Sequence, residues 1–300
     1  MSEPAVAFVT PVTAPRWARW LLFSPVARIV IFTALLVAFG AAANTLLGVF
    51  GWNAKQASPD TRAWVQLLSR AVPTVLAYLV LVKVVERRAV TELAARRILP
   101  DGALGVAAGL LLFSVVVGAL WLLGSYHVVG TDPHATWLPA LLTAGLGAGI
   151  AEEIICRGVL YRIVEEGLGS GWALLISALL FGAAHLANPN ATPWAALAIA
   201  IEAGLLFGLL YHLTRSLPLC MGLHAAWNFA QGTIYGIPVS GLDADGWLVS
   251  RRTGPDWLSG GAFGAEASVV ALALCSLCSL GLLVVAVRRG TLVRPAWRRR

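Results

Sequence analysis

The segment LPALLTAGLGAGIAEEIICR, residues 138–157, changes character abruptly at its end. Residues 138–150 carry no charge, then Glu152 and Glu153 stand side by side, and Arg157 follows four residues after the second glutamate. A run this apolar is typical of a helix inside a bilayer. An ionisable group in such a helix is costly and indicates a functional site. The segment therefore predicts a membrane span that carries a buried polar site.

The composition extends this interpretation to the whole chain. Of 300 residues, 58% are hydrophobic and 12% are charged, whereas a soluble domain has about 25% charged residues. The apolar residues form blocks close to the ~20 residues that a membrane helix needs, and lipid offers no partner to an exposed backbone. We predict an all-α polytopic membrane bundle of about eight transmembrane helices, at residues 28–50, 63–85, 103–123, 137–157, 172–187, 193–213, 216–236 and 265–287.

The basic residues indicate how these helices are oriented. Seventeen of them fall at the N-terminus, in the 83–101, 157–171 and 213–216 connections and in the tail, against four in the opposite connections. Because cytoplasmic loops collect Lys and Arg, we expect both termini in the cytoplasm. The net charge of +7 then reflects topology and contact with the lipid bilayer, not nucleic acid. We expect an integral protein of a bacterial plasma membrane. Nothing in the sequence indicates the oligomeric state.

Polar residues gather in the second half of the chain. Phe181 and His185 are four apart on the fifth predicted span, and His224 and Asn228 are four apart on the seventh. Four-residue spacing places both members of a pair on one helix face. We therefore predict one cavity between the fourth, fifth and seventh spans, shared by Glu152, Glu153, Arg157, Phe181, His185, His224 and Asn228. Glu202 also lies inside a span, and His212 at a span end is expected to be solvated.

This set has a chemical logic. A carboxylate beside an imidazole can take a proton from water, and a second imidazole with an amide can stabilise the oxyanion that forms. Arg157, four residues after Glu153, is placed to hold one carboxylate ionised, so that one glutamate can be structural while the other stays free for chemistry. A single intramembrane histidine is as often a satisfied contact between helices, but that account fits the whole set poorly.

The order of the motifs is also specific. EExxxR (EEIICR), FxxxH (FGAAH) and HxxxN (HAAWN), each on its own span, resemble the CPBP family of intramembrane proteases, which includes the CAAX prenyl endopeptidase and bacterial immunity-type membrane proteases. The segment 204–228 is similar to the family's run into its third motif. On this resemblance we divide the chain into a cytoplasmic segment 1–27, N-terminal helices 28–134, a catalytic core 135–235, an extracytoplasmic loop 236–264, and a last helix with a basic tail 265–300.

The resemblance implies a role for each motif residue. The catalytic residues would be a general base, Glu152, a water-orienting His185, and an oxyanion hole of His224 and Asn228; Glu153, Arg157 and Phe181 would support them. The expected activity is hydrolysis of a peptide bond in a membrane-associated or lipidated protein. We favour a mechanism without a cofactor, because an oxyanion hole is redundant beside a Lewis acid. A zinc ion held by Glu152, His185 and His224 is the alternative.

Two other classes of function compete with this one. A proton- or cation-coupled transporter would use intramembrane carboxylates, but the chain shows no inverted repeat. A non-catalytic immunity or scaffold protein could keep a protease-like fold. Other protease chemistries find no support, because HExxH, GxSG and paired GxGD and YD motifs are missing from the sequence.

Overall fold

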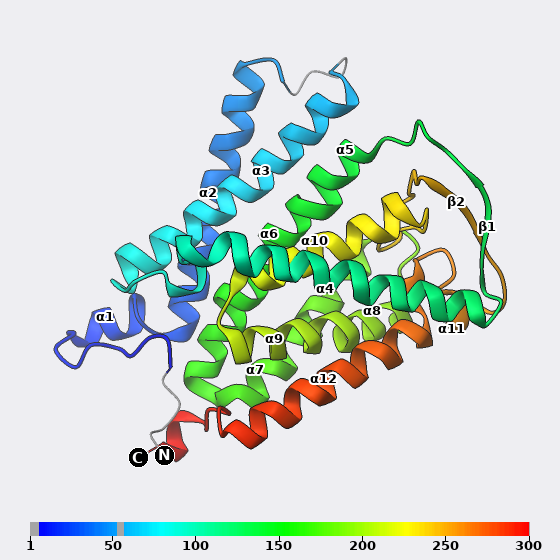
Figure 1. The fold of residues 1–300 in the computed structure, drawn as a ribbon. Coiled ribbons are helices and arrows are strands. Elements are labelled where there is room, and N and C mark those ends of the chain that lie inside the picture. The colour runs from blue at the N-terminus through cyan, green and yellow to red at the C-terminus, as the bar shows by residue number, and fades with distance from the viewer. Residues whose placement is uncertain (1–5, 53–56, 300) are drawn as a thin grey trace.

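A computed structural model describes residues 6–52 and 57–299 of the protein. Its structure is almost entirely helical (Figure 1). The α-helices are α1 Arg16–Leu21, α2 Pro25–Val49, α3 Pro59–Val80, α4 Ala95–Leu122, α5 Trp137–Ala140, α6 Ala148–Glu153, α7 Arg162–Ala184, α8 Pro193–Ile199, α9 Leu206–Thr214, α10 Leu217–Phe229, α11 Asp256–Ser259 and α12 Val269–Arg289. Residues 1–5 of the predicted N-terminal segment, Lys55 and the last arginine of the tail lie outside the described residues.

Several of these α-helices continue one another through wider π-helical or tighter 3-10 turns. The π-helical segments are η1 Leu81–Val85, η3 Leu141–Gly147, η4 Ile154–Tyr161, η6 Ala200–Leu205 and η7 Ala230–Ile234. The 3-10 turns are η2 Thr91–Leu93, η5 His185–Ala187, η8 Ala265–Ala267 and η9 Ala296–Arg298. Two of the π-helical segments contain conspicuous polar residues of the sequence, η4 with Arg157 and η6 with Glu202, and π-turns are frequent at functional sites.

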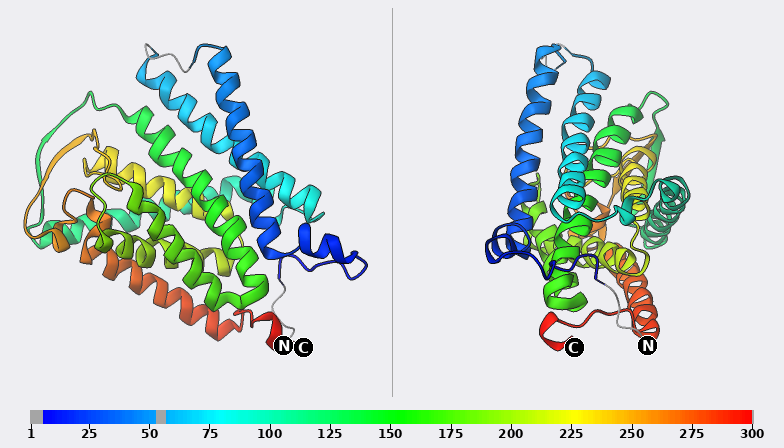
Figure 2. Two further views of the ribbon diagram at one scale, coloured as in Figure 1. Left: turned by 180° about the vertical axis from the view of Figure 1, so that it is seen from behind. Right: turned by 90° about the vertical axis from the view of Figure 1, so that its left-hand side faces the viewer.

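The predicted all-α membrane bundle is confirmed. Among the described residues, six helices are long and apolar enough to cross a bilayer. They are Pro25–Val49, Pro59–Val85, Ala95–Leu122, Trp137–Ala187, Pro193–Thr214 and Val269–Arg289. The chain is therefore an integral membrane protein, and α2 and α3 stand side by side at one edge of its bundle (Figures 1 and 2).

The stretch Trp137–Ala187 is too long for one span and is divided at Gly169. Its 51 residues bend where Gly169 takes a φ of 82°, a left-handed conformation that favours glycine. A Cβ there would lie 2.6 Å from the carbonyl oxygen of Val293. The chain thus reverses at this glycine, with the C-terminal tail packed against the turn.

The helix of the fourth predicted span continues past Arg157, where that span was predicted to end. Arg157 and Arg162 are both fully buried, although Arg162 was expected to lie in the connection that follows. Each arginine has a glutamate four residues away: Arg157 pairs with Glu153 at 3.0 Å, and Arg162 with Glu166 at 3.1 Å. An arginine that is paired with a glutamate one turn away can lie inside an apolar helix, so the helix need not end there.

One end of the bundle holds a network of buried ion pairs. Arg28 reaches Glu86 at 2.9 Å and Glu166 at 2.5 Å, and Arg162 lies 2.9 Å from the same Glu86 oxygen. Arg88 lies 2.8 Å from Glu86. The N-terminal helices, the connection after η1 and the turn at Gly169 therefore meet at one end, consistent with the common side that their basic residues predict.

The opposite end is closed by a two-stranded antiparallel sheet. β1 Tyr126–Thr131 pairs with β2 Leu248–Arg252, and the amide and hydroxyl of Thr136 both donate to Asp245 at 2.8 and 2.7 Å. Much of the predicted loop 236–264 is therefore held in place by the segment that leads into the fourth span.

Close packing of α4 on α10 sets the depth of the third motif. Gly105 and Gly109 form a GxxxG pair, and a Cβ on either would collide with a carbonyl of α10, at Leu219 and Leu223. Small residues at this spacing let two membrane helices approach closely. The residue after Leu223 is His224, so this contact fixes where its imidazole lies.

Candidate active site

Glu153 lies at the centre of the polar cluster. Its side chain is fully buried at the end of α6. Oε1 accepts a hydrogen bond from Arg157 Nη1 at 3.0 Å and one from His224 Nδ1 at 2.9 Å. A carboxylate only accepts, so the His224 proton at this contact sits on Nδ1. The first and third sequence motifs are joined through this carboxylate.

Arg157 ties the same point to the sixth span. Its Nη2 donates to the carbonyl oxygens of Ala203 and Gly204 at 2.9 and 3.1 Å. The guanidinium carbon also lies over two aromatic rings, 4.9 Å from the centroid of Phe181 and 5.2 Å from that of Phe207. A planar guanidinium suits such a site, because it combines forked donation with stacking.

Glu152 occupies a different environment from its neighbour. About a third of its side chain is exposed, at 35%, and no ion pair with an arginine involves it in the described part of the chain. Its Oε2 lies 3.9 Å from Nε2 of His224. The two adjacent carboxylates thus have opposite situations, one buried and paired, the other open and beside an imidazole.

His185 is oriented by its own helix. Its Nδ1 lies 2.8 Å from the carbonyl oxygen of Phe181, which can only accept, so Nδ1 carries the proton and Nε2 of the neutral ring keeps a lone pair. The rings of His185 and Phe181 are 4.8 Å apart, and Phe181 is 6.2 Å from His224. The FxxxH motif therefore places its aromatic ring against both imidazoles.

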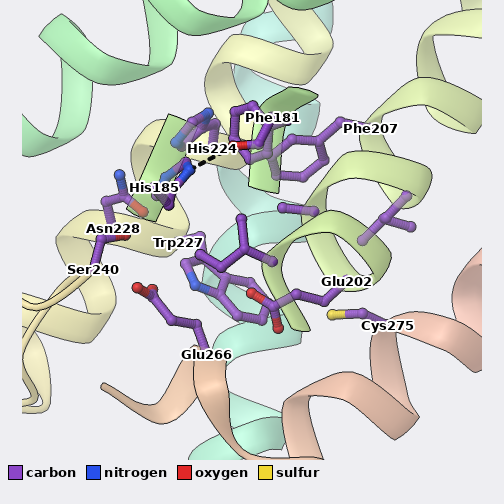
Figure 3. A pocket seen from close by; sticks show the side chains of 13 residues that line it. Phe181, His185, Glu202, Phe207, His224, Trp227, Asn228, Ser240, Glu266 and Cys275 are labelled. Carbon is purple, nitrogen blue, oxygen red and sulfur yellow. Dashed lines mark hydrogen bonds between the residues drawn. The ribbon is translucent and has the colours of Figure 1, made fainter. Parts of the chain in front are cut away.

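Asn228 lies one turn beyond His224 on α10. One N–H of its amide donates to the carbonyl oxygen of Ala144 at 2.8 Å. The second N–H of the amide is not used in this hydrogen bond. His185, His224 and Asn228 all line one pocket (Figure 3).

The walls of this pocket differ from the predicted cavity. Glu152 is not among the lining residues, although it is close to His224. The sixth span contributes Glu202 and Phe207, and the last helix contributes Cys275. The sixth span and the last helix therefore line this pocket together with the fifth and seventh spans, and two backbone carbonyls of the sixth span accept hydrogen bonds from Arg157.

Two polar residues near the bundle axis were missed or misjudged from the sequence. Glu266 in η8 is 2% exposed and lines the pocket; its only signal was an acidic residue directly before the last apolar run. His212 was expected to be solvated but is buried, 3.0 Å from Glu165 and 3.0 Å from the Thr291 hydroxyl. That interaction needs partners 47 and 79 residues away, which local patterns do not reveal.

The histidines and glutamates do not form a three-ligand metal site. Across residues 6–52 and 57–299, no group of three His, Cys, Asp or Glu side chains is placed to hold one ion. His224 and His185 each commit Nδ1 to a protein acceptor, Glu153 and the Phe181 carbonyl, so Nε2 is the atom of each ring that could bind a metal. Glu152 is not grouped with the two histidines around one point, and the zinc alternative remains a proposal.

Comparison with known families gives one match. Residues 134–230 match the model described as type II CAAX prenyl endopeptidase Rce1-like. The resemblance to the CPBP and CAAX protease family is thus confirmed over these residues. A search of the curated proteins found no match. The matched range contains all three sequence motifs and ends within η7, directly after α10.

Proposed function

We propose that the protein is an intramembrane endopeptidase in which Glu152 activates the attacking water. The observation that carries the proposal is the contrast between two adjacent carboxylates. Glu153 is buried and holds Arg157 and His224, whereas Glu152 is partly exposed and lies 3.9 Å from His224. A general base must be able to reach water and must not be locked in an ion pair, and Glu152 meets both conditions.

The proposed reaction is general-base hydrolysis of an amide. Water bound between Glu152 and the pocket gives a proton to the Glu152 carboxylate as its oxygen attacks the peptide carbonyl. The Nε2 lone pair of His185 accepts a hydrogen bond from the second O–H of this water and so orients the water oxygen. Glu152 then returns its proton to the leaving nitrogen, and the C–N bond breaks to give an acid and an amine.

The developing oxyanion needs donors inside the pocket. Asn228 has one amide N–H free beside the pocket, and His224 in its doubly protonated form can donate through Nε2. Donors fixed before the reaction act strongly in a water-poor site. Arg157 contributes indirectly, because it holds Glu153, and Glu153 holds the His224 ring.

The substrate is proposed to be a membrane protein or a lipidated peptide that reaches the site from the bilayer. The name of the matched family points to prenylated peptides, and this chain supplies an apolar setting for such a group. A second, apolar pocket lies between α3, α4, α6 and α10. Its lining residues include Leu79, Val106, Ile150 and Met221.

Both termini are proposed to be cytoplasmic. The segments with the most basic residues meet at one end of the bundle, and Asp243 is exposed at the other. A cysteine introduced at Asp243 in a cysteine-free background is expected to react with a membrane-impermeant reagent in intact cells, and one at Arg96 is not. The reverse pattern would invert the topology.

A comparison of membrane proteomes tests the function. Cells that produce the wild-type protein should accumulate cleaved forms of one or a few membrane proteins, and cells with Glu152→Gln should accumulate the uncleaved forms. Identical peptide ends in the two strains would contradict the proposal. A transporter would instead show ion flux in proteoliposomes that Glu152→Gln alters, and a non-catalytic scaffold would show neither effect. Activity lost with a chelator and restored by zinc would favour the metal mechanism.

A further inference from the structure

Two buried carboxylates in the pocket lack the ion pair that every other buried carboxylate has. Four buried glutamates each contact an arginine: Glu86 with Arg28, Glu92 with Arg88, Glu153 with Arg157 and Glu165 with Arg215. Glu202 and Glu266, each 2% exposed, form no ion pair among the described residues. A buried charge without a partner is costly, so these two glutamates require a different explanation.

Both carboxylates line the pocket, and each has an oxygen without a hydrogen-bond partner in the part of the chain that the structure describes. These atoms are Oε2 of Glu202 and Oε1 of Glu266. Glu202 lies in the π-helical segment η6 and Glu266 in η8, and both line the pocket with Trp227 (Figure 3). Segments 64 residues apart in sequence thus direct unsatisfied acceptors into the same space.

Trp227 adds an aromatic surface to this pair. Its indole N–H donates to Gln231 at 3.1 Å, which fixes the ring, and Figure 3 shows the indole drawn between Glu202 and Glu266. An aromatic face attracts a cation, most strongly for tryptophan. Two carboxylates and an indole are the groups that bind an ammonium or guanidinium ion.

Among the described residues, no arginine or lysine forms an ion pair with either carboxylate. Ser240, Gln231 and His185 interact with Glu266, and the arginine closest to it in sequence, Arg252, donates to the carbonyls of Ser259 and Gly261 instead. An alkyl chain that ends in a positive charge would pack on Trp227 and place the charge near both carboxylates. The pocket continues to His185, His224 and Asn228, so this chain would belong to a substrate held at the proposed active site.

We propose that Glu202, Glu266 and Trp227 form a specificity subsite for a lysine or arginine side chain of the peptide substrate. This inference rests on the proposed peptidase function and names one chemical feature of its substrate. The subsite shares its pocket with His185, His224 and Asn228, and Glu152 is not among the residues that line it.

Binding is tested without cleavage. The melting temperature, Tm, of the purified protein is measured with n-butylammonium chloride, n-butylguanidinium chloride, or n-butanol with matched sodium chloride. Ligand that binds the folded state raises Tm. We expect the organic cations to raise the Tm of the wild type more than the neutral control does, and Glu202→Gln and Glu266→Gln to lose the difference. Asp243→Asn, which removes an exposed carboxylate, is the matched control and should keep it. Equal responses to cation and alcohol in the wild type would overturn the subsite.

Cleavage supplies the second test. Lipid-anchored synthetic peptides that differ at one position, with Lys, Arg, Gln or Glu, are compared by mass spectrometry. The ratio of the lysine rate to the glutamine rate should fall by at least about tenfold in Glu202→Gln, because a site built around polar groups rejects a substrate that leaves them unpaired. Cleavage without any preference for Lys or Arg overturns the subsite and leaves the peptidase proposal standing. A cation-dependent Tm without cleavage of any peptide supports the cation site and contradicts the peptidase.

Discussion

His224 Nδ1 and Glu153 Oε1 lie 2.9 Å apart, although their residues are 71 positions apart in the chain. The contact joins the first and third motifs and turns the Nε2 atom of the same ring toward Glu152, at 3.9 Å. The carboxylate that the spacing predicts to be structural thereby also orients an imidazole of the proposed site. Changes at Glu153 or Arg157 are therefore expected to lower the cleavage rate, because the His224 ring loses its orientation, and to lower the stability of the fold.

Arg157→Gln should destabilise the protein strongly. It removes the 3.0 Å pair with Glu153 and the donors to two backbone carbonyls, and breaking a buried pair costs about 3–5 kcal/mol. Arg97→Gln is the control, because its pair with Asp101 is partly exposed, at 32% and 23%, and such pairs contribute about 0.2–1 kcal/mol. Thermal unfolding in detergent measures both. Equal decreases of Tm would show that Arg157 is not structurally special.

Asn228→Ala should slow cleavage while the fold persists. Removing one oxyanion donor typically lowers the rate by about 10²–10³. The variant also loses one structural hydrogen bond, the 2.8 Å bond from the amide to the Ala144 carbonyl. Asn190→Gly is the matched control: it removes an amide bonded to Gly241 at the outer end and keeps a backbone with φ of 57° that glycine tolerates. A rate unchanged in Asn228→Ala would remove this residue from the oxyanion hole.

Much of the candidate site could be predicted from the spacing of the motif residues. The EExxxR spacing predicts the Glu153–Arg157 pair that the structure contains, because four residues along a helix bring two side chains onto one face. The HxxxN spacing likewise puts His224 and Asn228 on one wall of the pocket. Contacts within a single helix follow from its period alone, so a sequence reveals them.

Contacts between distant helices did not follow from such patterns. Glu266 shares a pocket with Glu202 only because the last helix packs against the sixth span, and no local periodicity encodes that arrangement. The fourth span was ended too early for a related reason: Arg162 looks like a loop charge until its partner Glu86, 76 residues earlier, is seen. Charges in membrane helices are therefore interpreted correctly only with their partners.

Gly169→Ala should destabilise the turn between the fourth and fifth spans. A non-glycine residue at a φ of 82° is strained, at about 1–3 kcal/mol, and its Cβ would lie 2.6 Å from the Val293 carbonyl oxygen. Gly171→Ala, two residues on, meets nothing within 4 Å and has ordinary helical geometry. Tm should fall in the first variant and hold or rise in the second. No difference between the two would contradict the close packing of the tail on this turn.

The ion network at one end should make stability depend on pH. Burial opposes ionisation of Glu86 and Glu92, but the arginines around them outweigh it and hold the pKa of each carboxyl below its ordinary value of 4.5. A lowered folded-state pKa gives stability that is complete above the ordinary value and is lost as pH falls through the folded value. We expect Tm to fall as pH drops below about 4.5.

Arg88→Gln tests the source of that dependence. Arg88 bonds Glu86 at 2.8 Å and Glu92 at 3.0 Å, so its removal should lower Tm at neutral pH and flatten the acid slope. The exposed Arg251→Gln, at the opposite end, should leave the slope unchanged. An acid slope as steep in Arg88→Gln as in the wild type would place its origin elsewhere.

Single-turnover cleavage by Glu152→Gln shows whether Glu152 is the general base. Purified wild type and Glu152→Gln are reconstituted in liposomes, and single-turnover cleavage of a substrate peptide found by the membrane-proteome comparison is followed by mass spectrometry. Glutamine keeps the size and much of the hydrogen bonding of Glu152 but cannot accept a proton. If Glu152 is the base, Glu152→Gln should keep the Tm of the wild type and cleave only at the uncatalysed background; cleavage at the wild-type rate would rule out Glu152 as the base.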